Sequence, residues 1–120
     1  MGTGDKENFQ VGDWQVEPRL NLLSRDGRAT SLRPRVMDLL VFMSGRAGDV
    51  ISVEEVIDEV WDGVFVTNGV VYNCVNELRA TFNDTTDAPN YIETIAKRGY
   101  RMIATVSFPE GRPVFGRRAE

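Results

Sequence analysis

The sequence contains no histidine and a single cysteine, Cys74, among its 120 residues. A lone cysteine cannot form an intramolecular disulfide, and its presence fits a reducing compartment. Without histidine, a zinc site, a histidine-based catalytic triad and a haem site are nearly excluded. We therefore expect no metal and no other cofactor. We interpret Cys74 as a small core residue rather than a redox sensor, because the chain has no resolving cysteine.

Long apolar runs are also missing. No stretch of about 18 apolar residues is present, so no segment is expected to span a membrane, and the polar residues 1–8 lack the apolar core of a signal peptide. A hydrophobic content of 42% over this length fits one compact domain. The sequence predicts a cytoplasmic protein with a disordered segment at 1–8, a globular domain at 9–106 and a linker or tail at 107–120.

Basic residues are outnumbered by acidic ones, which gives the chain a net charge of −4. DNA-binding domains usually have a basic surface, so this value counts against nucleic acid at first sight. However, the segment 53–62 holds five acidic residues and no basic one, which leaves the rest of the chain at +1. The acidity counts against DNA only if the helix predicted there faces it. The five residues are Glu54, Glu55, Asp58, Glu59 and Asp62.

Turn and capping signals divide the chain into short elements. Asp26-Gly27 is a strong hairpin signal, and residues 9–32 are expected to form a small antiparallel sheet. A first helix begins at Pro34, a residue tolerated in the first turn. A second begins at Ser52, which opens a capping box. A third is capped by Thr67 and runs to about Phe82.

The last structured part is predicted to be a β-hairpin. Residues 91–106 form two β segments around Lys97-Arg98-Gly99. In the second segment apolar side chains recur at every second position as far as Val106. Strands followed by three helices and a terminal hairpin make a winged helix-turn-helix. The fold class is therefore α+β.

The third helix has two different faces. An apolar stripe recurs at helical spacing, and the opposite side is polar but almost without charge. Asparagine can pair with the edge of adenine, so a face of this kind suits a DNA groove, whereas the alternative is an ordinary surface that lacks charge. The stripe is Val71, Cys74, Val75, Leu78 and Phe82, and the polar face is Gly69, Tyr72, Asn73, Asn76, Ala80 and Asn83.

Basic residues gather at the hairpin turn. Lys97 and Arg98 are adjacent there, and cations on a protruding hairpin can reach phosphates or enter the minor groove. The alternative is a solvated turn. Arg33, Arg35 and Arg79 are further candidate phosphate contacts, although Arg79 lies at the border of the polar face and is equally suited to pair with an acid of the second helix.

Two stretches together resemble the C-terminal effector domain of OmpR/PhoB-type regulators, most closely the CadC/ToxR-like branch. They are VTNGVVYNCVNELR at 66–79 and YIETIAKRGYR at 91–101. The resemblance covers roughly residues 9–106. It implies a four-stranded N-terminal sheet, three helices and a wing, with the third helix in the major groove and the wing in the adjacent minor groove. It also implies a double-stranded DNA-binding bacterial transcription regulator.

The resemblance assigns residues to these roles. Wing contacts are expected at Thr94, Lys97 and Arg98. The loop after the second helix matches a segment that some relatives use to touch RNA polymerase, here Asp62, Gly63, Val64, Phe65 and Val66. Major-groove contacts are expected at Thr67, Asn68, Tyr72, Asn73 and Asn76.

The sequence also departs from this family. Many members carry several basic residues on the third helix, where this chain has only Arg79, and Ala96 occupies a position where many response regulators have a wing arginine. We therefore expect modest affinity, strong salt dependence and pairing on dimeric or tandem sites. We expect no receiver domain ahead of the first strand, unlike in response regulators. Arg112, Arg117 and Arg118 would fit the inner side of a membrane if the native chain continued past residue 120 into a membrane helix.

Two other classes of function remain open from the sequence. The negative net charge and the thinly charged third helix also fit a winged-helix interaction module that has lost DNA binding. An enzyme would have to use acids such as Glu54 and Asp58, which are better explained as the solvated face of a helix. Because no nucleophile or phosphate-loop motif accompanies them, we expect neither catalysis nor a small-molecule substrate.

Overall fold

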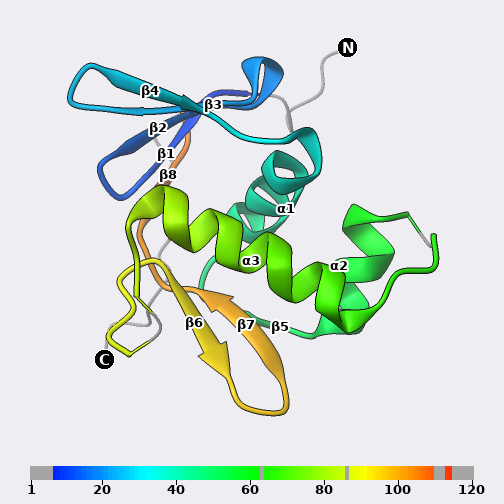
Figure 1. Cartoon of the computed structure of the whole chain (residues 1–120). Coiled ribbons are helices and arrows are strands. Elements are labelled where there is room, and N and C mark those ends of the chain that lie inside the picture. Colours follow the sequence, from blue (N-terminus) through cyan, green and yellow to red (C-terminus); the bar gives the residue numbers. More distant parts are fainter. Residues whose placement is uncertain (1–6, 63, 86, 110–112, 115–120) are drawn as a thin grey trace.

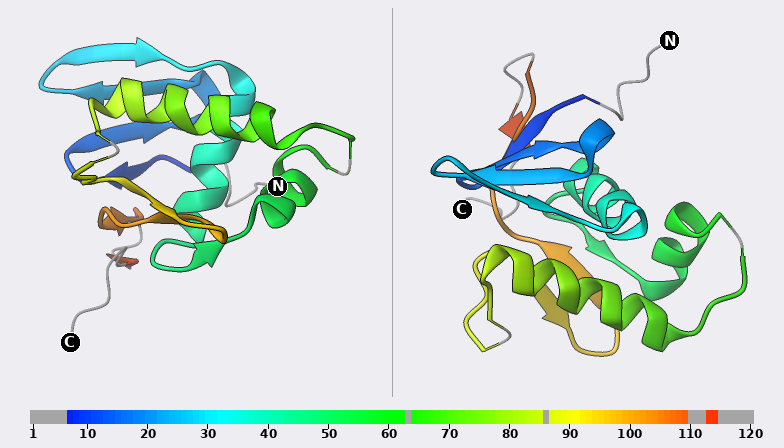
Figure 2. Two further views of the ribbon diagram at one scale, coloured as in Figure 1. Left: turned by 60° about the horizontal axis from the view of Figure 1, so that its bottom comes forward. Right: turned by 45° about the horizontal axis from the view of Figure 1, so that its top comes forward.

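The computed structural model describes residues 7–62, 64–85, 87–109 and 113–114. Two sheets pack together with three helices and a short 3-10 helix, η2 (Figures 1 and 2). Among the described helices, none is both long and apolar enough to cross a bilayer. The elements are β1 (Phe9–Val11), β2 (Trp14–Glu17), η2 (Pro18–Leu20), β3 (Leu22–Arg25), β4 (Arg28–Ser31), α1 (Pro34–Gly45), β5 (Val50–Ile51), α2 (Val53–Val60), α3 (Asn68–Phe82), β6 (Ile92–Ile95), β7 (Gly99–Met102), β8 (Val106–Ser107) and β9 (Pro113–Val114).

The larger sheet contains the four predicted N-terminal strands and two more. Its order is β4-β3-β2-β1-β8-β9, with every neighbouring pair antiparallel. Asp26 and Gly27 have φ of 54° and 80°, as a two-residue hairpin turn requires. Strand β8 includes Ser107 and pairs with β9, within the segment 107–120 that we expected to be a linker or tail. The predicted disorder at 1–8 falls largely on residues 1–6, which lie outside the described residues.

The second sheet carries the wing, in the order β5-β7-β6. The predicted hairpin is present, but its second strand ends at Met102 and does not continue to Val106. Ile103 and Ala104 are both buried, so the alternation is broken, and the chain crosses to the larger sheet, where Val106 pairs with Val11. Strand β5 was not predicted, because two residues give no periodic signal.

The three helices begin and end close to the predicted residues. Pro34 is the first residue of α1, and α3 begins after Thr67 and ends at Phe82. Helix α1 packs against both other helices, and its buried side chains include Val36, Leu39 and Leu40. The core therefore lies between α1, the two sheets and the inner side of α3, which leaves the outer side of α3 open to solvent.

The capping box of α2 is formed as the sequence predicts. The Ser52 hydroxyl accepts a hydrogen bond from the Glu55 backbone amide (3.0 Å), and the Glu55 carboxylate accepts one from the Ser52 amide (2.9 Å). The amide hydrogen bond lowers the pKa of Glu55. This cap fixes the start of α2 directly after β5, so it connects the wing sheet to the helices.

Replacing Ser52 by alanine should therefore destabilise the domain. The substitution removes the hydroxyl that accepts a hydrogen bond from the Glu55 amide, and caps of this kind are worth about 1 kcal/mol. Urea unfolding of Ser52→Ala and of Ser31→Ala, which alters an exposed residue of the edge strand β4, measures the difference. Equal midpoints for the two variants would show that the cap contributes nothing.

Candidate nucleic-acid interface

The outer side of α3 is exposed, polar and almost uncharged. All five residues of the predicted apolar stripe are buried, which confirms the helical phase inferred from the sequence. On the opposite side Tyr72 and Asn73 are exposed, and Tyr72 has 55% of its surface accessible, while Asn68 is exposed as the first residue of the helix. Thr67 at the N-cap is also exposed and its side chain makes no capping hydrogen bond. Groups that can donate and accept hydrogen bonds thus remain available along the first two turns.

Arg79 does not lie where either sequence interpretation places it. Its side chain is only 5% exposed, so it does not offer a phosphate contact, and it pairs with no acid of α2. Its Nη2 donates to the Ile92 carbonyl (3.1 Å) and to the Thr94 hydroxyl (2.7 Å). Its Nη1 lies 3.5 Å from the Asn76 side-chain oxygen. The physical reason is that β6 packs beside α3 and supplies the acceptors.

These hydrogen bonds change the roles available to Asn76 and Thr94. Asn76 is half-buried, so it supports Arg79 as well as bordering the exposed face. Thr94 is exposed, and a hydroxyl that accepts one hydrogen bond still has a hydrogen to donate. Arg79 therefore ties the orientation of the wing to that of α3.

Asp84 is a second positioning residue, and sequence reasoning missed it. It follows Asn83, which ends α3 in the left-handed conformation (φ 61°). The Asp84 carboxylate accepts backbone hydrogen bonds from Asn90 (2.7 Å), Tyr91 (3.1 Å) and Ile92 (3.0 Å). The Asp84 side chain therefore holds the start of β6 close to the end of α3. The only sequence signal was an acid within a polar loop, which many loops share.

The wing tip carries Lys97 and Arg98, and both are exposed. Lys97 has a positive φ of 64°, and the Arg98 amide donates to the Ile95 carbonyl (2.9 Å), which closes the turn. Neither cation makes an ion pair within the described part of the chain. Figure 1 shows the β6–β7 hairpin projecting beyond α3. The tip thus presents two uncompensated positive charges at the edge of the molecule.

Gly99 holds this tip against the start of α2. Its φ is +143°, and a Cβ atom there would lie 1.9 Å from the Ile51 carbonyl oxygen and 3.0 Å from the Ser52 Cα. Beside this contact lies a hollow of about 310 Å³ between the wing tip, the start of α2 and the start of α3. Its lining includes Glu54, Asn68, Thr94, Lys97 and Arg98.

The other two candidate phosphate contacts are already engaged. The Arg33 Nε donates to the Glu77 carboxylate (2.9 Å), and this interaction raises the pKa of Arg33 and lowers that of Glu77. The Arg35 Nη1 donates to the Val60 carbonyl at the end of α2 (2.7 Å). Both arginines remain partly exposed, so a phosphate could share each guanidinium, but only in competition with these partners.

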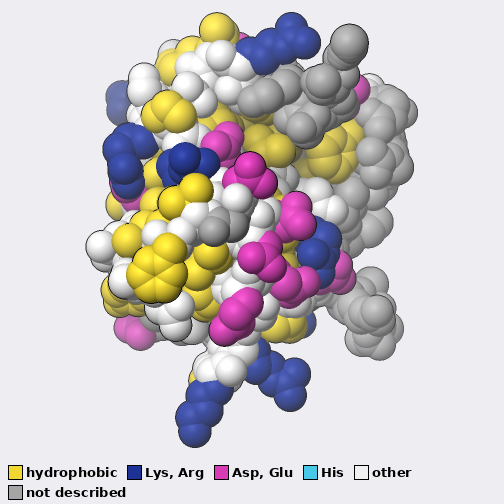
Figure 3. All heavy atoms as spheres, turned by 90° about the vertical axis from the view of Figure 1, so that its right-hand side faces the viewer, with side chains coloured by type: hydrophobic (Ala, Val, Ile, Leu, Met, Phe, Trp, Pro, Cys, Tyr) yellow, Lys and Arg dark blue, Asp and Glu magenta, His cyan; other side chains and the backbone are white. Residues whose placement is uncertain are grey.

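The loop between α2 and α3 exposes apolar side chains beside an acidic surface. Phe65 is 90% exposed and Val64 is also exposed, whereas Val66 packs against the core. Asp62 is exposed, and Gly63 lies outside the described residues. Figure 3 shows acidic side chains gathered on this face next to apolar ones, with basic side chains at the protrusion below. Acidic and apolar side chains thus share this face of the molecule.

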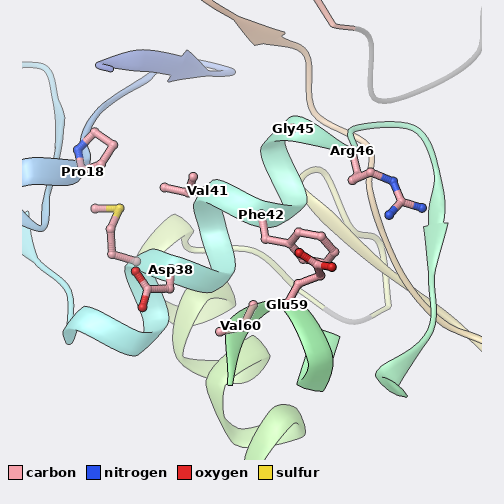
Figure 4. A pocket seen from close by; sticks show the side chains of 9 residues that line it. Pro18, Asp38, Val41, Phe42, Gly45, Arg46, Glu59 and Val60 are labelled. Atoms are coloured by element: carbon pink, nitrogen blue, oxygen red, sulfur yellow. The ribbon is translucent and has the colours of Figure 1, made fainter. Parts of the chain in front are cut away.

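A separate hollow of about 450 Å³ lies between η2, α1 and α2 (Figure 4). It combines apolar side chains such as Met37, Val41 and Phe42 with acidic Asp38 and Glu59. Its lining contains no residue of α3 or of the wing. It is therefore separate from the surface formed by α3 and the hairpin tip.

Cys74 lies in the core, as expected. Its side chain is buried in the apolar stripe of α3, and burial raises the pKa of the thiol. A raised pKa lowers the thiolate fraction at neutral pH, and the thiolate is the reactive form. The environment of Cys74 is therefore that of a packing residue.

Residues 27–102 match the family model described as transcriptional regulatory protein, C terminal. The chain is 46% identical over 98 residues to the transcriptional activator CadC of Escherichia coli K12, which covers 81% of this chain and 19% of that protein. The chain thus spans about a fifth of the length of this curated relative.

The fold is similar to those of solved DNA-binding domains. The DNA-binding domain of E. coli CadC superimposes with a TM-score of 0.77 and 42% identity, covering 85% of this chain and 96% of that one. The RstA DNA-binding domain of Klebsiella pneumoniae, solved in complex with the RstA box, gives a TM-score of 0.69 at 20% identity and covers 79% of this chain and 95% of that one. At that identity the second likeness concerns the fold alone.

Proposed function

Because this chain belongs to the family of transcriptional regulatory protein C-terminal domains, of the OmpR/PhoB type, we propose that it binds double-stranded DNA and regulates transcription. One observation carries the proposal. Asn68, an exposed and uncharged residue at the start of α3, borders the same hollow as Lys97 and Arg98, which have no ion-pair partner among the described residues. A helix suited to base edges and a basic hairpin are thus held at a fixed distance from one another.

In this arrangement α3 enters the major groove and the wing enters the adjacent minor groove. Asn68 and Asn73 face base edges, which amide side chains read by paired hydrogen bonds, and Tyr72 reaches a phosphate or a thymine methyl. Thr67, at the start of the helix, donates its hydroxyl hydrogen to the DNA backbone. Asn76, behind these residues, acts at the border of the groove while supporting Arg79.

The wing residues contact the backbone. Lys97 and Arg98 neutralise phosphates or enter the minor groove, and Thr94 donates its free hydroxyl hydrogen to a phosphate. Arg33 and Arg35 add to this attraction only when a phosphate competes with Glu77 or with the Val60 carbonyl. With so few free cations, one domain binds weakly, and regulation uses two domains on dimeric or tandem sites.

The loop at residues 62–66 is proposed to contact RNA polymerase. Val64 and Phe65 expose apolar surface on the end of the molecule that carries the acids of α2, which suits a partner with apolar and basic groups (Figure 3). This contact needs the domain on DNA, so the domain works in the bacterial cytoplasm. If the full-length protein continues into a membrane helix, the domain lies on the cytoplasmic face of that membrane.

Replacing Asn73 by alanine should remove sequence discrimination without removing DNA binding. A bidentate asparagine–adenine pair is worth about 1–3 kcal/mol of discrimination, so a duplex selected from a random pool should lose about ten-fold or more in affinity. Binding to a random-sequence duplex should change little, because the phosphate contacts remain. Fluorescence anisotropy with both duplexes measures the two values.

Two controls accompany this experiment. Alanine has a higher helix propensity than asparagine, so α3 should not be weakened, which circular dichroism checks. Gln15→Ala removes an exposed amide from β2, on the other sheet, and should leave both affinities unchanged. If the parent chain selects no sequence from the pool and binds no random duplex at low salt, the proposed function is wrong.

A winged-helix module that binds proteins and not DNA is the second candidate. The exposure of Phe65 and the acidic side chains of α2 favour it, because these features do not help DNA binding. This candidate predicts a complex that forms without DNA and that depends on Val64 and Phe65. The chain would then show no affinity for any duplex, and substitutions in the wing would leave complex formation unchanged.

A further inference from the structure

We propose that Glu54 limits the affinity of this domain for DNA by holding a carboxylate against the phosphate backbone between the two grooves. The inference rests on the proposed function, since it concerns the DNA that the domain would bind.

The start of α2 lies directly beside the wing tip. Ile51 pairs with Tyr100 across the wing sheet, and Gly99 touches the Ile51 carbonyl and the Ser52 Cα so closely that no side chain fits between them. Glu54 follows two residues after Ser52, in the first turn of α2. The capping box fixes that turn, so the position of Glu54 relative to Lys97 and Arg98 is set by the fold.

The hollow of about 310 Å³ marks where a DNA backbone would run. A duplex with α3 in its major groove and the wing in the next minor groove must place the strand that separates those grooves between the two elements. The hollow lies between Asn68 at the start of α3 and the cations of the wing tip. A phosphate there would meet Lys97, Arg98 and the Thr94 hydroxyl.

Glu54 lines the same hollow with an opposing charge. Its side chain is exposed and takes part in no ion pair or hydrogen bond within the described part of the chain. The carboxylate is therefore not neutralised by a protein cation when DNA arrives. Two like charges at the distances of such a site repel, and the repulsion weakens as salt increases.

The consequence is a specific asymmetry among the acids of α2. Asp58 is exposed, lies one helical turn further on and does not line the hollow. Both residues contribute the same charge to the molecule, but only Glu54 meets the backbone. Removing its charge should tighten binding to any duplex, because phosphates are independent of sequence.

The test compares Glu54→Gln with Asp58→Asn. Fluorescence anisotropy with a random-sequence duplex measures the dissociation constant of the 120-residue chain and of both variants between about 20 and 200 mM salt. We expect Glu54→Gln to bind about five-fold more tightly at the lowest salt, and Asp58→Asn to bind less than two-fold more tightly. The ratio between Glu54→Gln and the parent should approach one as salt increases.

Four other results would overturn the proposal. Equal tightening by both variants would show that only net charge matters. Weaker binding by Glu54→Gln, at all salt concentrations, would show that Glu54 orients a wing cation. If the parent binds the duplex and Glu54→Gln matches it, the role of Glu54 is wrong while the proposed function stands. If neither the parent nor the variants bind the duplex, both the role of Glu54 and the proposed function are wrong. Circular dichroism checks that each variant is folded.

Discussion

The double variant Lys97→Ala/Arg98→Ala should lose about thirty-fold in affinity for a random-sequence duplex at low salt. Each cation is exposed on the wing tip and has no acidic partner within the described residues, so each charge is available to a phosphate. At about 1 kcal/mol for each lost contact, the two together account for that factor. Anisotropy across a salt series should also show a salt slope that is shallower by about 2, since each neutralised phosphate contributes about 0.9.

A matched control removes two cations from elsewhere. Arg19 in η2 and Arg28 in β4 are exposed, and Figure 1 shows β4 and its sheet on the side of the molecule opposite the wing. Their replacement by alanine changes the net charge equally, and we expect it to leave the salt slope of the parent unchanged. If both double variants lose the same affinity, the wing is not a contact element and the attraction is only a matter of net charge.

Replacing Gly99 by alanine should destabilise the domain by about 3 kcal/mol, because both backbone strain and a steric clash arise at one position. The φ of +143° is poorly accessible to residues with a side chain, and the added Cβ would lie 1.9 Å from the Ile51 carbonyl oxygen. Relief requires β7 to move away from β5, and the wing tip moves with it. Urea unfolding measures the loss of stability.

Two other glycines separate these causes. Gly27 has a φ of +80° with no atom within 4 Å of an added Cβ, so Gly27→Ala tests strain alone and should be less harmful. Gly45 at the end of α1 has open space and no positive φ, so Gly45→Ala should be nearly neutral. A Gly99→Ala variant as stable as Gly45→Ala would show that the contact between the wing and β5 is not close.

The helices could be predicted from the sequence because their signals are local. Pro34 marks the start of α1, Ser52 and Glu55 form a complete capping box within four residues, and the apolar stripe of α3 repeats at the helical period. Each of these features depends on neighbours in the chain. The same holds for the Asp26-Gly27 turn, whose positive φ values follow from the residues themselves.

The pairing of distant segments was not predictable in the same way. Strand β8 joins the N-terminal sheet through a pairing of Val106 with Val11, and no local pattern at either residue specifies that partner. The surroundings of the arginines likewise depend on segments that are distant in the sequence. Arg33 meets Glu77 from a position 44 residues away, and Arg79 finds its acceptors in β6, so both were expected to be freer than they are.

The candidate interface was therefore predicted in outline and corrected in detail. The exposure of Tyr72 and Asn73 follows from helical periodicity alone, whereas that of Asn68 does not, because Asn68 lies seven residues before the buried Val75. The position of Glu54 beside the wing tip does not follow from periodicity either, because it depends on the contact of Gly99 with Ile51. Acidic residues that belong to one helix in the sequence thus acquire different surroundings in the structure.

The most direct test of the account is a titration of the isotopically labelled chain with a DNA duplex, followed by backbone amide resonances in NMR. The account predicts that the largest changes fall on residues 67–76 of α3 and on residues 94–98 of the wing. Residues 55–60 of α2 and the N-terminal sheet should change little. Changes confined to residues 58–66, or no change at any residue at low salt, would contradict the claim that α3 and the wing together bind DNA.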